Sequence, residues 1–192
     1  MAHFRGRHNP ATGGQIKTMD GVTHEIKNWD LLIAHPPCTY LSNAGARHLW
    51  KGHTLQADRV MLGIQGRDLF MKFWWANVPR ICVENPIPSR VFCLPEYTQT
   101  IQPWMFGHPY TKKTCLWLKG LPELQPTNTV KPTATWCPSG SYSKKHGQQH
   151  KGMFTTDRAK NRSKTFPGIA DAMATQWGQL LESEAKSAPD TQ

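Results

Sequence analysis

Two side chains in this sequence, Cys38 and Glu84, are suited to covalent chemistry. Cys38 ends the segment His-Pro-Pro-Cys, and Glu84 opens the segment Glu-Asn-Pro. A thiolate is a strong nucleophile, and a carboxyl group in a poorly hydrated pocket can hold a proton near neutrality. Together they could attack an electron-poor ring and protonate one of its nitrogens. The same residues also fit a core cysteine and a glutamate that caps a strand, so both interpretations stay open.

The apolar runs before these residues are expected to be neighbouring strands. Residues 29–34 and 80–83 have the pattern of short buried strands, and residues 55–76 between them have a helical pattern. A strand, a helix and a second strand form a unit in which the strands are parallel, so their carboxyl ends reach the same edge of the sheet. We therefore expect Cys38 and Glu84 to be neighbours.

Composition divides the chain, most simply one domain of 192 residues, into four parts. Residues 1–28 are a polar N-terminal arm, and residues 29–121 are a catalytic α/β core with a third strand at 115–118. Residues 122–165 are an irregular, basic recognition segment. Residues 166–192 form a C-terminal helix that packs on the core, followed by a tail.

The charge of the chain predicts a polyanionic partner. The net charge is +10, and the basic residues gather late in the sequence, where Asp157 is the one acidic residue among them. This local asymmetry favours nucleic acid, although a solvated basic surface is the alternative. The basic stretch consists of Lys144, Lys145, Lys151, Arg158, Lys160, Arg162 and Lys164.

The cysteines and the apolar runs predict a cytoplasmic location. Five cysteines at wide spacings favour reduced thiols, and neither a signal peptide nor an apolar stretch of membrane length is present. We therefore expect no membrane partner. Cys137, His146 and His150 resemble half of a zinc site, which is too few ligands, so no metal is expected.

The residues around Cys38 and Glu84 resemble the catalytic signatures of the DNA cytosine-C5 methyltransferases. Those signatures are a Pro-Cys nucleophile loop and a Glu-Asn-Val strand end, with Pro86 in place of the valine here. Residues 106–118 resemble the family's Gly-x-Pro-Gln-x-Arg-x-Arg segment. The chain is similar to small phage-encoded members, with His-Pro-Pro-Cys-Thr-Tyr-Leu, Glu-Asn-Pro and a terminal Pro-Gly-Ile-Ala-x-Ala-Met-Ala in that order.

This resemblance implies a DNA (cytosine-5)-methyltransferase that uses S-adenosylmethionine on a cytosine swung out of double-stranded DNA. Cys38, on a loop stiffened by Pro37, would attack C6 of the base. Glu84 would protonate or hydrogen-bond N3, and Asn85 would brace the Cys38 loop. A lysine would take the place of the family's arginine near O2 of the base, and the candidates are Lys112 and Lys113.

The resemblance also implies a cofactor site and a DNA-binding surface. The family's Phe-x-Gly-x-Gly turn is missing, so we expect an N-terminally truncated fold whose cofactor site a homodimer or partner chain completes. The residues expected to contact the cofactor are Asp20, Asp30, Pro36 and Ile169. DNA is expected to contact Asn43, Arg47 and the basic stretch. A phage-encoded protein would act in the cytoplasm of its bacterial host.

The fold expected from these observations is α/β and Rossmann-like, of the class I methyltransferase type. It would contain a mostly parallel sheet, N-terminally truncated, with an irregular basic insertion. Two alternatives to the methyltransferase stay open. One is a catalytically inert DNA-binding relative, and the other is a thiol enzyme that acts on a nucleotide with another donor. His35 is expected to hydrogen-bond a backbone carbonyl, although contact with a base is the alternative.

Overall fold

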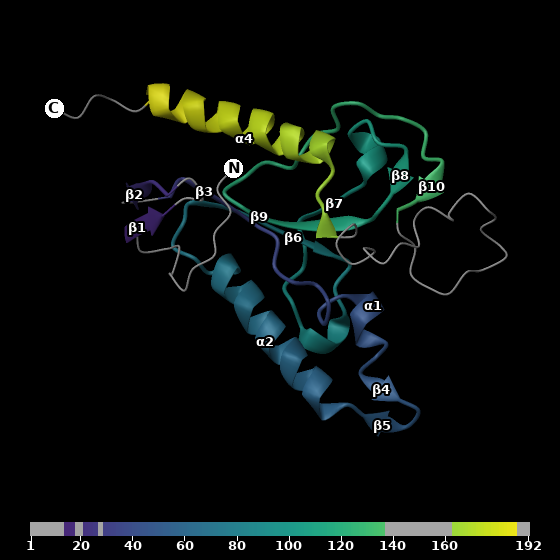
Figure 1. Ribbon diagram of the computed structural model, residues 1–192. Coiled ribbons are helices and arrows are strands. Elements are labelled where there is room, and N and C mark those ends of the chain that lie inside the picture. The colour runs from purple at the N-terminus through teal and green to yellow at the C-terminus, as the bar shows by residue number, and fades with distance from the viewer. Residues whose placement is uncertain (1–13, 18–20, 27–28, 137–162, 188–192) are drawn as a thin grey trace. The chain divides into compact units, whose positions relative to one another are not determined.

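The structure is a computed structural model, and it describes residues 14–17, 21–26, 29–136 and 163–187. The chain divides into two compact units (Figure 1). The first contains residues 1–99 and 116–121, and the second contains residues 100–115 and 122–192.

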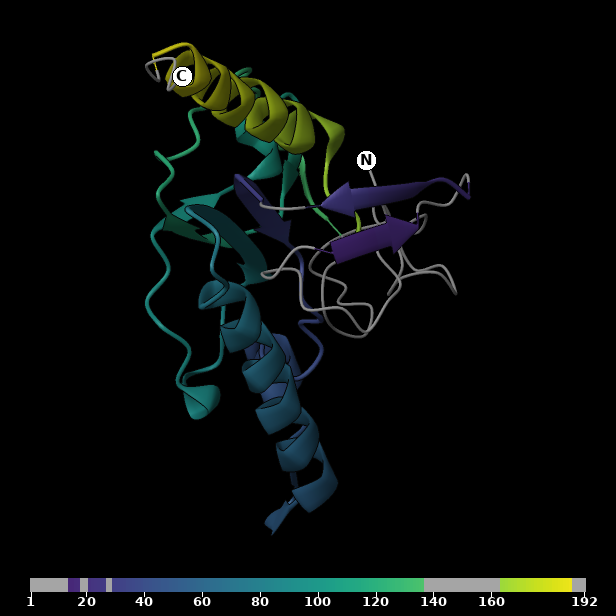
Figure 2. The ribbon, with the colours of Figure 1, turned by 90° about the vertical axis from the view of Figure 1, so that its left-hand side faces the viewer.

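The first unit holds a strand–helix–strand unit and two small hairpins. Its elements are β1 (Gly14–Lys17), β2 (Thr23–Ile26), β3 (Leu31–Ala34), α1 (Asn43–Ala46), β4 (Trp50–Lys51), β5 (Thr54–Leu55), α2 (Ala57–Trp74), β6 (Arg80–Pro86) and the 3₁₀ turn η1 (Arg90–Phe92). β1 pairs with β2 in antiparallel orientation (Figure 2), and β4 also pairs with β5 in antiparallel orientation. The predicted order of strand, helix and strand over residues 29–83 is confirmed.

The central sheet has the strand order β3-β6-β9-β7, where β7 is Gln99–Ile101 and β9 is Thr114–Lys119. β3 and β6 pair in parallel, with Leu31 opposite Arg80 and Ala34 opposite Val83. The end of β9 lies at the start of β6, since Lys119 Nζ donates a hydrogen bond to the carbonyl oxygen of Ala76 at 3.2 Å, as antiparallel neighbours require.

The sheet is therefore mixed, and the expectation of a mostly parallel, clearly Rossmann-like sheet is wrong, while the α/β class is confirmed. The physical reason is the connections. A parallel neighbour needs a long crossover, usually a helix. α2 supplies one between β3 and β6, whereas the chain from β6 to β9 contains only short strands and 3₁₀ turns.

α2 packs through small residues and aromatic rings. A Cβ on Gly63 would lie 2.0 Å from the ring of Phe92, so only glycine allows η1 to approach this closely. Phe70 is fully buried and meets the ring of Trp117 edge-on, with 5.0 Å between centroids. The helix expected over residues 55–76 is confirmed, and Ile64, which is 40% exposed, lies outside its packing face.

The second unit contains short strands and a long C-terminal helix. Its elements are η2 (Pro103–Met105), β8 (Tyr110–Thr111), β10 (Ala134–Thr135) and α4 (Pro167–Ser187). β10 pairs with β8 in parallel. Trp177 of α4 is fully buried and donates from Nε1 to the carbonyl oxygen of Pro122 at 3.1 Å. The C-terminal helix expected within residues 166–192 is confirmed, and it extends from Pro167 to Ser187.

The packing at the start of α4 explains why the Pro-Gly-Ile-Ala segment has glycine at position 168. A Cβ on Gly168 would lie 2.1 Å from the carbonyl oxygen of Phe106, so a side chain has no room there. The Gly168 amide donates to Nε2 of His108 at 3.1 Å. Among the described residues, no helix is long and apolar enough to cross a membrane.

Candidate active site

The loop that follows β3 and the end of β6 meet at one edge of the sheet. Because Ala34 lies opposite Val83 in the parallel register, the next residues along the two strands, His35 and Glu84, come side by side. The His-Pro-Pro-Cys and Glu-Asn-Pro segments therefore meet through His35 and Glu84, while the expected proximity of Cys38 to Glu84 stays a prediction. The register of one strand pair is enough to bring the two segments together.

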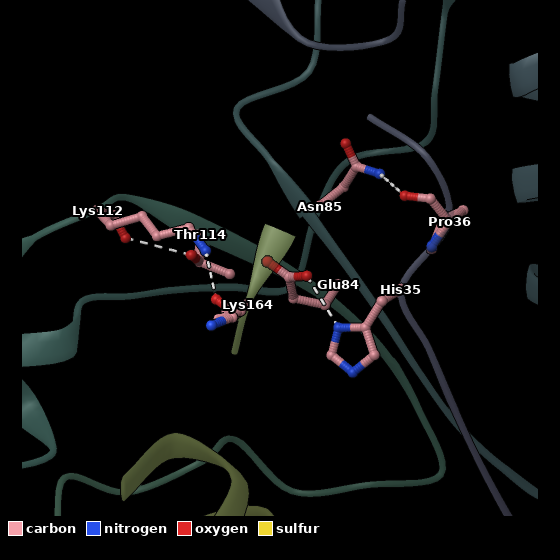
Figure 3. A network of polar contacts seen from close by, with 7 residues as sticks. All are labelled: His35, Pro36, Glu84, Asn85, Lys112, Thr114 and Lys164. Atoms are coloured by element: carbon pink, nitrogen blue, oxygen red, sulfur yellow. Dashed lines mark hydrogen bonds and ion pairs between the residues drawn. The ribbon is translucent and has the colours of Figure 1, made fainter. Parts of the chain in front are cut away.

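A hydrogen bond joins His35 and Glu84 at this edge (Figure 3). His35 Nδ1 lies 2.9 Å from Glu84 Oε2, and the side chains are 35% and 16% exposed. The expectation that His35 would bond to a backbone carbonyl is wrong. A signal was present in the sequence, since each residue is the first polar one after its apolar run, and a parallel pairing sets such residues opposite one another.

Asn85 links the His-Pro-Pro-Cys and Glu-Asn-Pro segments through a second hydrogen bond. Its side chain is fully buried, and Nδ2 donates to the carbonyl oxygen of Pro36 at 3.3 Å (Figure 3). Its other polar atom, Oδ1, is buried and has no hydrogen-bond partner among the described residues. Burying an unpaired acceptor is costly, so this position carries a specific constraint and does not serve merely to fill the core.

The loop that carries Cys38 is held in place by backbone hydrogen bonds. Cys38 is partly buried, and its carbonyl oxygen accepts from the Ser42 amide at 3.1 Å. Farther along, the Ser89 amide donates to the carbonyl oxygen of Leu41 at 2.7 Å, and the Asn43 amide donates to the residue-87 carbonyl at 3.1 Å. The residues after β6 therefore support the loop after β3 on both sides of Cys38, together with Asn85.

The small-residue segment after Cys38 is a tight turn. It forms α1, and a Cβ on Gly45 would lie 1.9 Å from the carbonyl oxygen of Thr39. Arg59 of α2 covers this turn, with its guanidinium carbon 5.0 Å from the ring centroid of Tyr40 and Nη2 donating to the carbonyl oxygen of Gly45 at 3.5 Å. Sequence reasoning missed this role of Arg59, because only the packing of α2 brings it to the loop.

A second cysteine near the site, Cys82, is not suited to nucleophilic attack. It lies on β6 two residues before Glu84 and is fully buried. Burial, and to a lesser extent the charge of Glu84, raises the pKa of the Cys82 thiol, so the thiolate is strongly disfavoured. The described cysteines, Cys38, Cys82, Cys93 and Cys115, form no disulfide with one another.

Two of the residues expected to bind S-adenosylmethionine, Asp30 and Pro36, lie beyond opposite ends of β3. Asp30 is exposed and precedes β3, at the opposite end of the strand from Cys38, and four residues of strand span about 13 Å. Pro36 is buried, with its carbonyl occupied by Asn85. Ile169 is buried within the second unit, and Asp20 lies outside the described residues.

The lysines expected near O2 of the base belong to the second unit. Lys112 Nζ donates to the carbonyl oxygen of Lys164 at 3.1 Å and lies 5.9 Å from the ring centroid of Phe166. The hydroxyl of Thr114 donates to the Lys112 carbonyl oxygen at 3.2 Å (Figure 3). Lys113 is exposed. In the structure Lys112 therefore holds the chain just before α4.

Of the residues expected to contact DNA, Asn43, Arg47 and Lys164 are described, and all three are exposed. Asn43 begins α1, and Arg47 follows it, with Nε donating to Nε2 of His48 at 3.0 Å. The remaining basic residues lie outside the described part of the chain, namely Lys144, Lys145, Lys151, Arg158, Lys160 and Arg162.

Metal binding finds no support in the described part of the chain, where no group of three or more potential metal-ligating side chains occurs. Cys137, His146 and His150 lie outside it.

Comparison of the chain with models of known protein families, with curated proteins and with solved structures finds no match. A function for this chain is therefore inferred from the chemistry and positions of its own residues.

Proposed function

We propose that this protein is a DNA (cytosine-5)-methyltransferase in which Cys38 adds covalently to the target base. The observation that carries the proposal is the joining of the Cys38 loop to the end of β6. Asn85 bonds to Pro36 within that loop, and Glu84 lies beside His35 at the same edge. A nucleophile and an acid at one sheet edge is the arrangement that addition to a pyrimidine ring requires.

The chemical step needs both groups. The Cys38 thiolate forms a bond to C6 of cytosine, and the C5=C6 double bond is lost. The electrons pass through C4 to N3, which takes a proton from Glu84. The product is an enamine whose C5 is nucleophilic. After C5 has reacted with an electrophile, loss of its hydrogen and of the Cys38 sulfur restores the ring.

His35 is a positioning residue in this scheme. Its Nδ1 engages Oε2 of Glu84, so the remaining oxygen, Oε1, is the one that would reach N3 of the base. A carboxylate held by one hydrogen bond loses rotational freedom before the substrate arrives, which favours a single reactive geometry.

S-adenosylmethionine would supply the methyl group as an electrophile. Two of the residues expected to contact it, Asp30 and Pro36, are separated by the length of β3. This observation favours the second candidate, an inert DNA-binding relative. The two candidates differ in base activation, which depends on Cys38 and Glu84 alone and can be measured without a methyl donor.

The experiment is tritium release from DNA. An enamine at C5 takes a proton from water when no other electrophile is present, so reversal of the addition exchanges the C5 hydrogen with solvent. Random-sequence double-stranded DNA labelled at C5 of cytosine is incubated with the full chain, with no methyl donor. We expect release of tritium that Cys38→Ser and Glu84→Gln abolish and that Cys93→Ser, at an exposed cysteine outside this site, leaves unchanged.

His35→Asn tests the positioning role in the same assay. Loss of a charge-assisted hydrogen bond at a partly exposed site is worth about 1.4 kcal/mol, so release should slow about tenfold. The pH profile of release should also change form, because Oε2 of Glu84 loses its hydrogen bond to His35. An unchanged rate and profile would exclude a role for His35.

S-adenosylmethionine is then added. Methylated cytosine supports the methyltransferase, and tritium release without methylation indicates a thiol enzyme with another donor. DNA binding without any release would reject the proposal and favour the inert relative.

A further inference from the structure

The outward face of α2 carries large apolar side chains that are exposed among the described residues. Met61 is 55% exposed, Leu62 40% and Leu69 38%. They lie at helical spacing within one stripe along the solvent side. Its seven exposed residues are Asp58, Met61, Leu62, Gln65, Asp68, Leu69 and Lys72.

This stripe is not the packing face of the helix. The packing face contains Gly63 against Phe92, and also Phe70 and Met71, which are buried. A surface helix that packs on one face normally presents polar side chains on the other. Contiguous exposed apolar side chains with a polar rim are typical of interaction surfaces.

The stripe is complementary to itself when two copies run in opposite directions. Gln65 is its midpoint, and Asp58 precedes it by seven residues while Lys72 follows it by seven. With Gln65 on a two-fold axis, Asp58 of each copy lies opposite Lys72 of the other, two turns or about 10 Å from the axis. Leu62 of each copy then lies against Leu69 of the other.

The charges of the stripe indicate which kind of partner would bind to it. The chain has a net charge of +10, yet the stripe holds two aspartates and one lysine. A net negative, apolar surface does not suit phosphates, so nucleic acid is a poor partner for this face. A symmetric pair of Asp58–Lys72 contacts suits a second copy, because a two-fold interface brings one patch against the same patch.

We propose that this protein forms a two-fold symmetric dimer through antiparallel packing of α2 against α2 of a second copy. In this register Leu62 of each copy packs against Leu69 of the other, Met61 lies beside Asp68, and an Asp58–Lys72 ion pair closes each end. The proposal is independent of the reaction assigned to Cys38.

The test is sedimentation equilibrium of the full chain over a wide range of concentrations at physiological ionic strength. The wild type should approach twice the chain mass of 21.8 kDa. Leu69→Asp buries a charge in the interface and should raise the dissociation constant at least about tenfold. Val91→Asp is the matched control, since Val91 is 60% exposed and lies on η1, and it should leave the dimer intact.

Reversing the charges of Asp58 and Lys72 tests whether the two α2 helices pack in the proposed antiparallel register. Asp58→Lys and Lys72→Asp should each weaken the dimer about fivefold, and the double variant should restore it. Helix stability would predict the opposite for the double variant, because lysine in the first turn and aspartate in the last turn both oppose the helix dipole. Restoration therefore reports the contact between copies.

Two results would overturn the inference. One is a wild-type chain that stays at the monomer mass at every concentration. The other is a dimer that Leu69→Asp and the charge reversals leave unchanged, which would place the interface elsewhere.

Discussion

Two substitutions of Asn85 test the role of its buried side chain in stability. Asn85→Asp, which keeps the shape of the side chain, should lower the free energy of unfolding more than Asn85→Ala does. The Asn85 side chain is fully buried, donates one hydrogen bond to the Pro36 carbonyl and leaves Oδ1 without a partner among the described residues. Asn85→Ala removes the bond and also removes the unpaired acceptor. Asn85→Asp keeps the shape, but it replaces the donor by a second oxygen that faces the carbonyl.

The magnitudes follow from these contacts. In Asn85→Ala, loss of the bond and an unpaired Pro36 carbonyl cost about 2–4 kcal/mol, and removal of the buried Oδ1 offsets about 1–3 kcal/mol. The net loss is about 1 kcal/mol, or about 2–4 °C in Tm for a chain of this size. An unpaired buried carboxylate in Asn85→Asp costs about 3 kcal/mol or more, so Tm should fall by at least about 6 °C.

Thermal unfolding followed by circular dichroism at several pH values is the assay. Burial raises the pKa of the carboxyl group introduced by Asn85→Asp above its unfolded value, so its folded state is favoured when the group is protonated. The deficit of this variant should therefore shrink as the pH falls toward about 4, because a protonated carboxyl can donate to the Pro36 carbonyl. An Asn85→Asp variant as stable as Asn85→Ala at neutral pH, with no pH dependence, would refute the reasoning.

Two further predictions concern packing and pH. Gly63→Ala should destabilise the folded state by about 1–3 kcal/mol, because its Cβ would overlap the ring of Phe92. Gly178→Ala in α4, where nothing lies within 4 Å of the new Cβ, should instead stabilise the folded state by about 0.5–1 kcal/mol. Urea unfolding of both variants measures this contrast, and equal effects would contradict it. Because burial raises the pKa of Cys82, the stability that its protonated thiol contributes is complete below the ordinary thiol pKa and is lost as the pH rises above it. Unfolding free energies measured at increasing alkaline pH should fall less steeply for Cys82→Ala than for the wild type, by up to about 1.4 kcal/mol per pH unit, and parallel slopes would contradict this assignment.

The sequence by itself determined where the strands and the crossover helix lie. Apolar runs of four residues ended by polar and proline residues identify β3 and β6, and a parallel pairing of the two follows from the helix between them. That reasoning was sufficient to bring the Cys38 loop to the end of β6. It depends only on local pattern and on the handedness of strand–helix–strand connections, so no long-range contact had to be known.

Tertiary structure alone decided the partners and the faces. The ends of the two apolar runs indicate that His35 and Glu84 lie level, but only the folded structure shows Nδ1 of His35 2.9 Å from Oε2 of Glu84. The packing face of α2 depends on Gly63, because a missing side chain lets Phe92 approach from a distant part of the chain. Hydrogen-bond partners and buried faces arise from contacts between residues far apart in sequence, whereas periodicity reports only what neighbours along the chain share.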